Sequence, residues 1–178
     1  MKRSTITLVI ASVALITGVG LLVILYWNKW DSVGTTPQDV SMSGPMRSAN
    51  KVSFDVSQAP FERGEDIVVS LLIQPGWHVN ATPASLDTLI PTTVSTTLGD
   101  QPMNIPTVYP PGEDSGVYLG DHLIKVYGDG AKIRLRPDDQ TLQRMAKAKV
   151  LGIRVRVQAC SDSGICLPPS DLDSTLAL

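Results

Sequence analysis

Cys160 and Cys166 are the only cysteines in the chain, and they are the residues with the clearest capacity for chemistry. The residues between them include the run Ser-Asp-Ser-Gly, which is typical of a turn. A turn there can bring the two sulfurs close enough to form a disulfide. Such a pair supplies what thiol–disulfide exchange requires, namely a thiolate that attacks a partner disulfide and a second sulfur that resolves the mixed disulfide.

The spacing of the pair leaves two interpretations open. It is not Cys-x-x-Cys, and no βαβ pattern surrounds it, which argues against a thioredoxin domain. A structural zinc site would need four ligands, and too few lie nearby. Because most disulfides in exported proteins are static, the spacing alone favours a structural bridge over a redox couple.

His78 and His122 are the only histidines in the chain. Either could assist a thiolate, or bind a metal together with Cys166 or a methionine. The methionines considered as soft ligands for copper(I) are Met42, Met46 and Met103. Their spacing matches no convincing ligand pattern. We therefore expect ordinary histidines and no cofactor, and keep a soft-metal chaperone as the third alternative.

The charge balance argues against nucleic-acid binding. The formal net charge is −2, and the chain beyond Lys2 and Arg3 is more acidic still. Nucleic-acid binding requires a basic face, so no nucleic-acid partner is expected. The arginines that alternate along two later segments are predicted to mark the solvated sides of strands; they are Arg134, Arg136, Arg154 and Arg156.

The first part of the chain predicts a membrane anchor. Residues 5–27 carry no charge, and a spanning helix needs about 20 apolar residues. This run exceeds the apolar core of a typical cleaved signal, which favours an uncleaved anchor. Lys2 and Arg3 place the N-terminus on the cytoplasmic side. The aromatic residues that suit the far headgroup region are Tyr26, Trp27 and Trp30. The predicted organisation is a cytoplasmic tail over 1–4, an anchor over 5–27, a flexible tether over 28–50 and a folded domain over 51–178.

The elements that must position the cysteines are short strands separated by Pro and Gly. The predicted strands cover 52–56, 66–73, 92–97, 123–127, 131–136, 150–158 and 171–178. Residues 128–130 are predicted to form a hairpin turn. One short helix is predicted after Pro137, with Asp138 or Asp139 as its cap. Its apolar residues at helical spacing are Leu142, Met145 and Ala146. This pattern predicts an all-β, antiparallel β-sandwich with one short helix.

The strand over 150–158 leads directly to the cysteines. Its apolar face consists of Ile153, Val155 and Val157. By strict alternation Cys160 falls on the polar side together with Gln158, which predicts an accessible position at the rim of the sheet. A bulge after Gln158 would reverse that prediction.

Three motifs lie in the predicted domain. The first, over 157–169, reads Val-Gln-Ala-Cys-Ser-Asp-Ser-Gly-Ile-Cys-Leu-Pro-Pro. The second, over 75–92, begins Pro-Gly-Trp-His-Val-Asn, and the third and weaker one runs from Tyr-Pro-Pro-Gly-Glu at 109–113 to Tyr-Leu-Gly at 118–120. Together they resemble the N-terminal periplasmic domain of the thiol:disulfide interchange protein DsbD, over nearly all of 52–178.

The resemblance implies an immunoglobulin-like sandwich whose cysteines cycle between dithiol and disulfide. It implies a bacterial inner-membrane protein with its domain in the periplasm. Electrons would come from a thioredoxin-like or multi-span thiol-transporting membrane protein and pass to an oxidised periplasmic protein. A cytochrome-maturation factor, a disulfide isomerase and a single dedicated client are alternatives for that acceptor. In the family pattern Cys166 faces the partner sulfur and Cys160 resolves.

The resemblance also implies a cap loop over the cysteines, here around 112–120. Its acidic residues Glu113 and Asp114 would raise a nearby thiol pKa by charge repulsion, and Tyr118 is the best match for the aromatic residue that shields the sulfur. Full DsbD adds a multi-span domain and a C-terminal thioredoxin domain. We therefore expect this chain to take its reducing equivalents from another protein. The alternative function is a binding or assembly module whose disulfide is static.

Overall fold

Short antiparallel strands make up most of the part of the chain that the structure describes, residues 44–57 and 65–178 of a computed structural model. These residues belong to the unit Gly44–Leu178. The predicted tail and anchor, and Met42, lie outside the described residues. Within the described ranges no helix is long and apolar enough to cross a bilayer.

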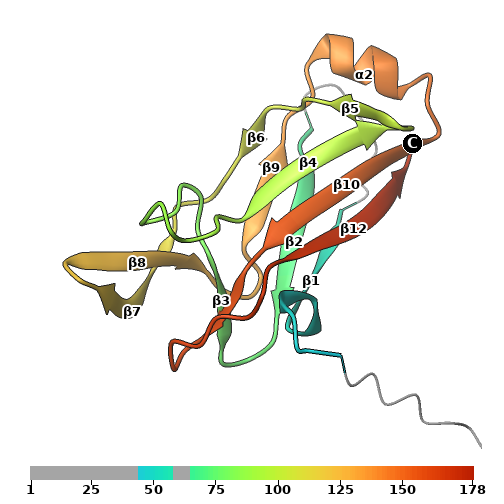
Figure 1. The fold of residues 1–178 in the computed structure, drawn as a ribbon. Helices are drawn as coiled ribbons and strands as arrows, with labels where there is room; N and C mark the ends of the chain where they lie inside the picture. Colours follow the sequence, from blue (N-terminus) through green and yellow to red (C-terminus); the bar gives the residue numbers. More distant parts are fainter. Residues whose placement is uncertain (1–43, 58–64) are drawn as a thin grey trace, which may run out of the picture. The chain divides into compact units, whose positions relative to one another are not determined.

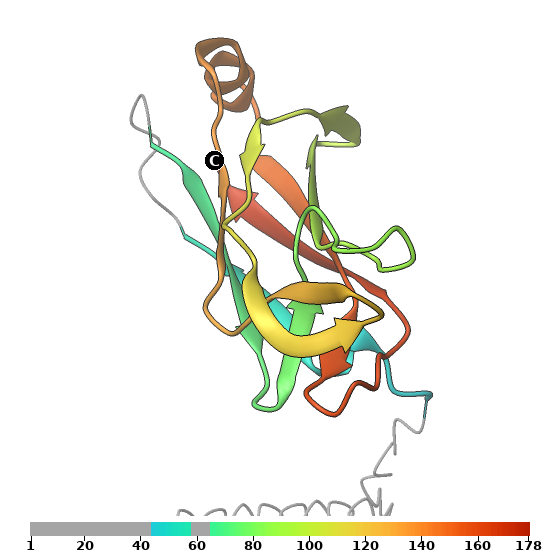
Figure 2. The ribbon, with the colours of Figure 1, turned by 90° about the vertical axis from the view of Figure 1, so that its left-hand side faces the viewer.

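The strands form three four-stranded antiparallel sheets within the described residues. Their chain order is β1 (Val52–Val56), β2 (Ile67–Ile73), β3 (Trp77–Asn80), β4 (Thr93–Leu98), β5 (Gln101–Met103), β6 (Thr107–Val108), β7 (Glu113–Leu119), β8 (His122–Tyr127), β9 (Lys132–Leu135), β10 (Val150–Val157), β11 (Ala159–Ser161) and β12 (Ser170–Ala177). The sheet orders are β1-β2-β9-β6, β12-β10-β4-β5 and β11-β3-β8-β7. The first two face each other as a sandwich (Figure 1), and the third lies at one end, away from the helix α2 (Asp139–Met145) (Figure 2).

The core forms because several strands alternate apolar and polar residues. On β10 the inward side chains are each at most 1% exposed; they are Leu151, Ile153, Val155 and Val157. Burial of one such side chain contributes about 1.5–3 kcal/mol. On the outward side of β10, Arg154 pairs with Asp173 and Arg156 with Asp171. The predicted role of the alternating arginines is confirmed here.

Most predicted elements are confirmed. The segments over 52–56, 66–73, 92–97, 123–127, 131–136, 150–158 and 171–178 match β1, β2, β4, β8, β9, β10 and β12 to within one residue at each end. The helix α2 begins after Asp138, whose side chain accepts a hydrogen bond from the Thr141 backbone, as an N-cap should. The all-β sandwich with one short helix is therefore correct.

The predicted hairpin at 128–130 is wrong. β8 pairs with β3 and β7, whereas β9 pairs with β2 and β6, so the turn carries the chain from one sheet to another. Around this turn Gly130 and Ala131 hydrogen-bond to Leu71 of β2. Gly and Asp signal a reversal of the chain, but they do not determine which strands pair across it.

Candidate thiol–disulfide site

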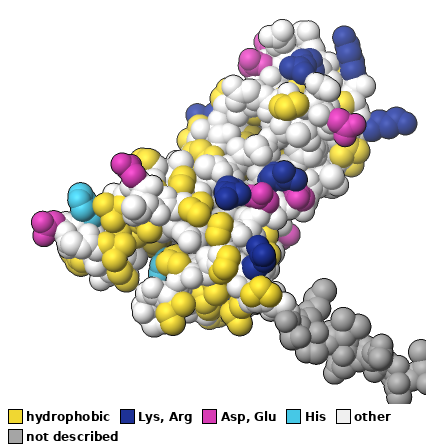
Figure 3. Space-filling model, in the orientation of Figure 1, with side chains coloured by type: hydrophobic (Ala, Val, Ile, Leu, Met, Phe, Trp, Pro, Cys, Tyr) yellow, Lys and Arg dark blue, Asp and Glu magenta, His cyan; other side chains and the backbone are white. Residues whose placement is uncertain are grey.

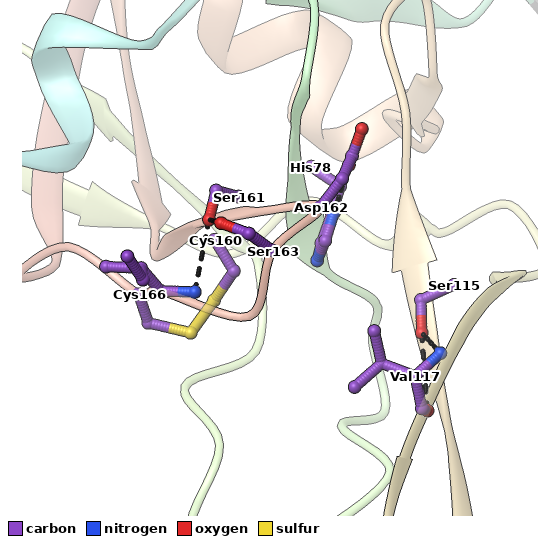
Figure 4. A network of polar contacts seen from close by, with 9 residues as sticks. His78, Ser115, Val117, Cys160, Ser161, Asp162, Ser163 and Cys166 are labelled. Carbon is purple, nitrogen blue, oxygen red and sulfur yellow. Dashed lines mark hydrogen bonds and ion pairs between the residues drawn. A yellow bond between two sulfur atoms is a disulfide. The ribbon is translucent and has the colours of Figure 1, made fainter.

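Cys160 and Cys166 form a disulfide across a very short hairpin (Figure 4). The S–S distance is 2.07 Å and the Cα–Cα distance is 4.0 Å. The Ser161 amide donates to the Ile165 carbonyl and the Leu167 amide to the Ala159 carbonyl, each at 2.8 Å. These bonds flank the cysteines, which therefore occupy a non-hydrogen-bonded antiparallel pair, the position where side chains lie closest.

The predicted turn between the cysteines is confirmed, and Ser161 organises it. The Ser161 hydroxyl accepts a hydrogen bond from the Ile165 amide at 3.1 Å and contacts the Ser163 hydroxyl at 2.9 Å. Gly164 has a φ of +88°, a conformation that suits glycine, and its amide donates to the Ser161 carbonyl. The Ser-Asp-Ser-Gly run thus fixes the tight reversal that joins the sulfurs.

The two cysteines differ in exposure. Cys160 is only 4% exposed, whereas Cys166 is exposed. The alternation-based prediction that Cys160 lies at an accessible rim is wrong, because the alternation is broken at Gln158. The chain leaves the sheet of β10 there and joins β3 as β11, so Ala159 and Cys160 are buried one after the other. A bulge after Gln158 is expected to reverse the predicted accessibility of Cys160. The change of sheet at Gln158 has that effect, because Cys160 is buried.

Ser48 ties the hairpin to the segment that precedes the domain. It begins the short 3-10 helix η1 (Ser48–Asn50) and is fully buried. Its hydroxyl donates to the Pro168 carbonyl at 2.8 Å and accepts from the Ala159 amide at 2.9 Å. The last residues of the predicted tether therefore hydrogen-bond to both strands of the cysteine hairpin. The prediction of the tether gave no sign of this role, because the contact joins residues that are far apart in sequence.

Gln158 links the hairpin to β3. Its side-chain amide donates to the Leu167 carbonyl and accepts from the buried Asn80 amide, each at 3.4 Å. Asn80 also donates to the Ile90 carbonyl at 3.1 Å. At the point where the chain leaves the sheet of β10, the polar groups of the Gln158 side chain thus have hydrogen-bond partners.

His78 lies directly opposite Cys160 in the register between β3 and β11. Its Nδ1 atom is 3.2 Å from a carboxylate oxygen of Asp162, the residue two positions after Cys160. The imidazole is 12% exposed and the Asp162 carboxylate 73% exposed. Figure 4 shows this pair beside the cysteine hairpin. Sequence reasoning had singled out His78 but missed Asp162, which looked like a turn residue.

The predicted cap residues form part of a strand. Glu113, Asp114 and Tyr118 belong to β7, and two strands lie between β7 and the cysteine strand β11. Asp114 forms an ion pair with Lys125. Tyr118 is 64% exposed near the tip of the β7–β8 hairpin. The structure brings none of these three side chains into a recorded contact with the disulfide, so their tuning role stays a prediction.

The candidate metal ligands are spread over the domain. Met103 is buried in the core, Met46 is exposed, and His122 begins β8 on the far hairpin. In the ranges 44–57 and 65–178, no three or more His, Cys, Asp or Glu residues group together as a metal site would require.

Exposed apolar side chains lie at the cysteine end of the domain. Ile165, next to Cys166, is 64% exposed, and Leu119 on the far β7–β8 hairpin of the same sheet is 47% exposed. In Figure 3 hydrophobic side chains gather over this end, whereas ion pairs lie along the middle of the face. The exposed residue Cys166 therefore lies beside an exposed apolar side chain.

The fold and site define an antiparallel β-sandwich domain with one exposed and one buried cysteine in a short edge hairpin. No protein-family model matches the chain, and no curated protein matches it. Among solved structures it is similar to the N-terminal domain of DsbD from Neisseria meningitidis, crystallised in the reduced form. The TM-score is 0.50 and the identity 15%, and the match covers 75% of this chain and 90% of that one. At this identity the likeness shows the fold.

Proposed function

We propose that this protein exchanges electrons through Cys160 and Cys166, as a thiol–disulfide interchange protein. The observation that carries the proposal is the difference in exposure between the two cysteine residues. An exposed Cys166 can reach a partner, while a buried Cys160 is protected from side reactions and positioned to resolve. The fold likeness to the DsbD domain supports the same assignment.

The reaction follows from this geometry. In the reduced protein the Cys166 thiolate attacks a partner disulfide, and one partner sulfur leaves as a thiolate. Cys160 then attacks the Cys166 sulfur of the mixed disulfide. The Cys160–Cys166 bond forms, the bond to the partner breaks, and the partner leaves as a dithiol. The partner gains two electrons and this protein loses two.

The size of the bridge argues against a purely structural role. The cysteines are only six positions apart, and closing so short a loop contributes roughly 2 kcal/mol in the chain-entropy model. The flanking ladder bonds and Ser48 already hold the hairpin. The disulfide's contribution as a brace is therefore at the low end of the range for disulfides, and other contacts also hold the hairpin.

The remaining parts of the proposal concern setting. The sandwich is of the immunoglobulin-like type, and residues 5–27 anchor it to a bacterial inner membrane with the domain in the periplasm. A thioredoxin-like or multi-span thiol-transporting membrane protein regenerates the dithiol, and an oxidised periplasmic protein accepts the electrons. The experiment for the anchor is fractionation of membranes from cells producing the full chain, with and without residues 5–27.

Redox titration tests the central proposal. The full chain is equilibrated with glutathione buffers, and the dithiol fraction is measured by alkylation and mass spectrometry. A working couple titrates above about −300 mV, whereas a static bridge lies below that value. A bridge that stays closed throughout would overturn the proposal.

A matched pair of variants tests the roles of the two sulfurs. Cys160→Ala leaves the exposed sulfur, and Cys166→Ala leaves the buried one. With oxidised glutathione, the first should form a mixed disulfide much faster than the second. Equal rates would refute the assignment of Cys166 as the attacking residue.

A further inference from the structure

We propose that His78, oriented by Asp162, accepts the proton of the Cys160 thiol in the step that resolves the mixed disulfide. This inference rests on the proposed function and adds a proton acceptor to it. The sequence singled out His78, but the exchange reaction described above leaves its position unexplained.

The register places the three side chains on one face of the sheet. Cys160 and His78 are cross-strand partners, and such partners project to the same side with Cβ atoms roughly 4.5–5.5 Å apart. Asp162 directly follows β11, and its carboxylate reaches the same side, where one oxygen lies 3.2 Å from Nδ1 of His78. The alternate residues Val79 and Ala159 project to the other side, into the hydrophobic core. His78 and Cys160 are thus neighbours outside that core.

The hydrogen bond to Asp162 sets the imidazole for accepting a proton. A carboxylate only accepts hydrogen bonds, so the Nδ1 atom of His78 carries the hydrogen in the 3.2 Å contact. The Nε2 atom of the neutral ring is then the acceptor. The Asp162 amide donates to the Gly76 carbonyl at 3.1 Å, which fixes the position of Asp162 relative to β3.

The two sulfurs differ in their need for such an acceptor. Cys166 is exposed and can lose its proton to water. Cys160 is buried, and burial disfavours the charged thiolate. A proton acceptor beside Cys160 therefore helps the resolving attack and has little effect on the first attack.

The step balances as follows. The Cys160 S–H bond breaks and its proton passes to Nε2 of His78, while the sulfur electron pair forms the bond to Cys166. The Cys166–partner bond breaks, and its electron pair leaves on the partner sulfur. The protonated imidazole then returns its proton to that thiolate or to water.

Other charged groups near His78 come from two elements. Asp162 directly follows β11. On the β8 side, Tyr127 pairs with Val79, and Gly128 is the next residue along the chain. The carboxylate of Glu113 lies close to Gly128, since an ideal Cβ built on this glycine would be 3.9 Å from one of its oxygens. Both groups are acidic. Lys125 of β8 is paired with Asp114.

The test separates the two sulfur attacks kinetically. The full chain is reduced and mixed with 5,5′-dithiobis(2-nitrobenzoate). Release of the first thionitrobenzoate reports attack by Cys166, and release of the second reports resolution by Cys160. The variants are His78→Gln and Asp162→Asn, with His122→Gln as the control at an exposed histidine of the far hairpin.

His78→Gln should slow the second release about a hundredfold at neutral pH, the low end of general-base effects, and leave the first unchanged. Asp162→Asn should slow the second release less. In the parent the second rate should fall as the pH is lowered between about 8 and 5, where histidine ordinarily becomes charged. His78→Gln should lack that histidine-dependent fall and recover its rate only at alkaline pH. His122→Gln should behave as the parent.

The outcomes separate this inference from the proposed function. A parent protein that releases only one equivalent, or none, refutes thiol exchange by the pair, and the inference falls with it. A second outcome is that the parent protein releases both equivalents, and that His78→Gln and Asp162→Asn give the second release at the parent rate and with the parent pH profile. This outcome refutes only the role of His78 as proton acceptor. Slowing of both releases to the same degree would show that His78 has a structural role, and would also refute it.

Discussion

Replacement of Ser48 by alanine should destabilise the domain by breaking its contact with the cysteine hairpin. The Ser48 hydroxyl is the hydrogen-bond partner of the Ala159 amide, and both residues are fully buried. The Pro168 carbonyl loses one donor but keeps the Ser48 amide at 3.1 Å. The main cost is therefore one buried N–H group without a partner, which amounts to about 1–3 kcal/mol. We expect a loss of about 2 kcal/mol in the free energy of unfolding.

The loss should be visible in thermal and urea unfolding of the oxidised full chain, followed by far-ultraviolet circular dichroism. For a domain of this size, 2 kcal/mol corresponds to a fall in Tm of roughly 6–10 °C. The control is Ser53→Ala, at an exposed position on the neighbouring strand β1, where a change within about 0.5 kcal/mol is expected. If the two variants are equally stable, the inference that η1 stabilises the hairpin through this hydroxyl is refuted.

Three further predictions concern the core, the backbone and pH. Ile153→Ala should cost about 2–5 kcal/mol because the side chain is 1% exposed, whereas Val150→Ala on the same strand, 43% exposed, should cost far less; comparable urea midpoints would contradict the assigned faces of β10. Gly112→Ala should lower the thermal midpoint because its Cβ would lie 2.7 Å from that of a neighbouring alanine, while Gly128→Ala has room; equal midpoints would show that the close approach is absent. Burial raises the pKa of the Tyr127 phenol above 10.0, so the native state holds that proton more tightly than the unfolded state and stability should fall above about pH 10. Between pH 9 and 11 the free energy of unfolding should fall less steeply in Tyr127→Phe than in the parent protein. Parallel curves would exclude Tyr127 as the cause of the loss of stability at high pH.

The sequence predicted those parts of the fold that local patterns encode. The alternation over 150–158 predicts β10, and the position of Asp138 ahead of an apolar period predicts the cap of α2. The Ser-Asp-Ser-Gly run predicts the reversal between the cysteines. Each of these features depends on neighbours within a few residues, so composition and spacing are sufficient.

The rest depends on contacts between distant segments. Ser48 lies 111 positions from Ala159, and His78 lies 84 from Asp162, so no periodic pattern links them. The change of sheet at Gln158 depends on β3 being available as a new partner. Strict alternation failed at Cys160 for that reason. Likewise, the family resemblance predicts a loop around 112–120, whereas most of this segment pairs with β8 as the strand β7.

The bonds on either side of the disulfide have a consequence for how the protein changes oxidation state. The main-chain hydrogen bonds from Ser161 to Ile165 and from Leu167 to Ala159 do not involve the sulfurs, so we expect them to persist in the proposed dithiol form. Opening the bond therefore requires side-chain rotation and small local shifts, with no refolding of the edge. The oxidised and reduced forms should therefore present almost the same surface shape to a binding protein. Thiol–disulfide exchange in either direction should then require little conformational change. A binding protein would then distinguish the two forms by the reactivity of one sulfur, since their shapes are nearly alike.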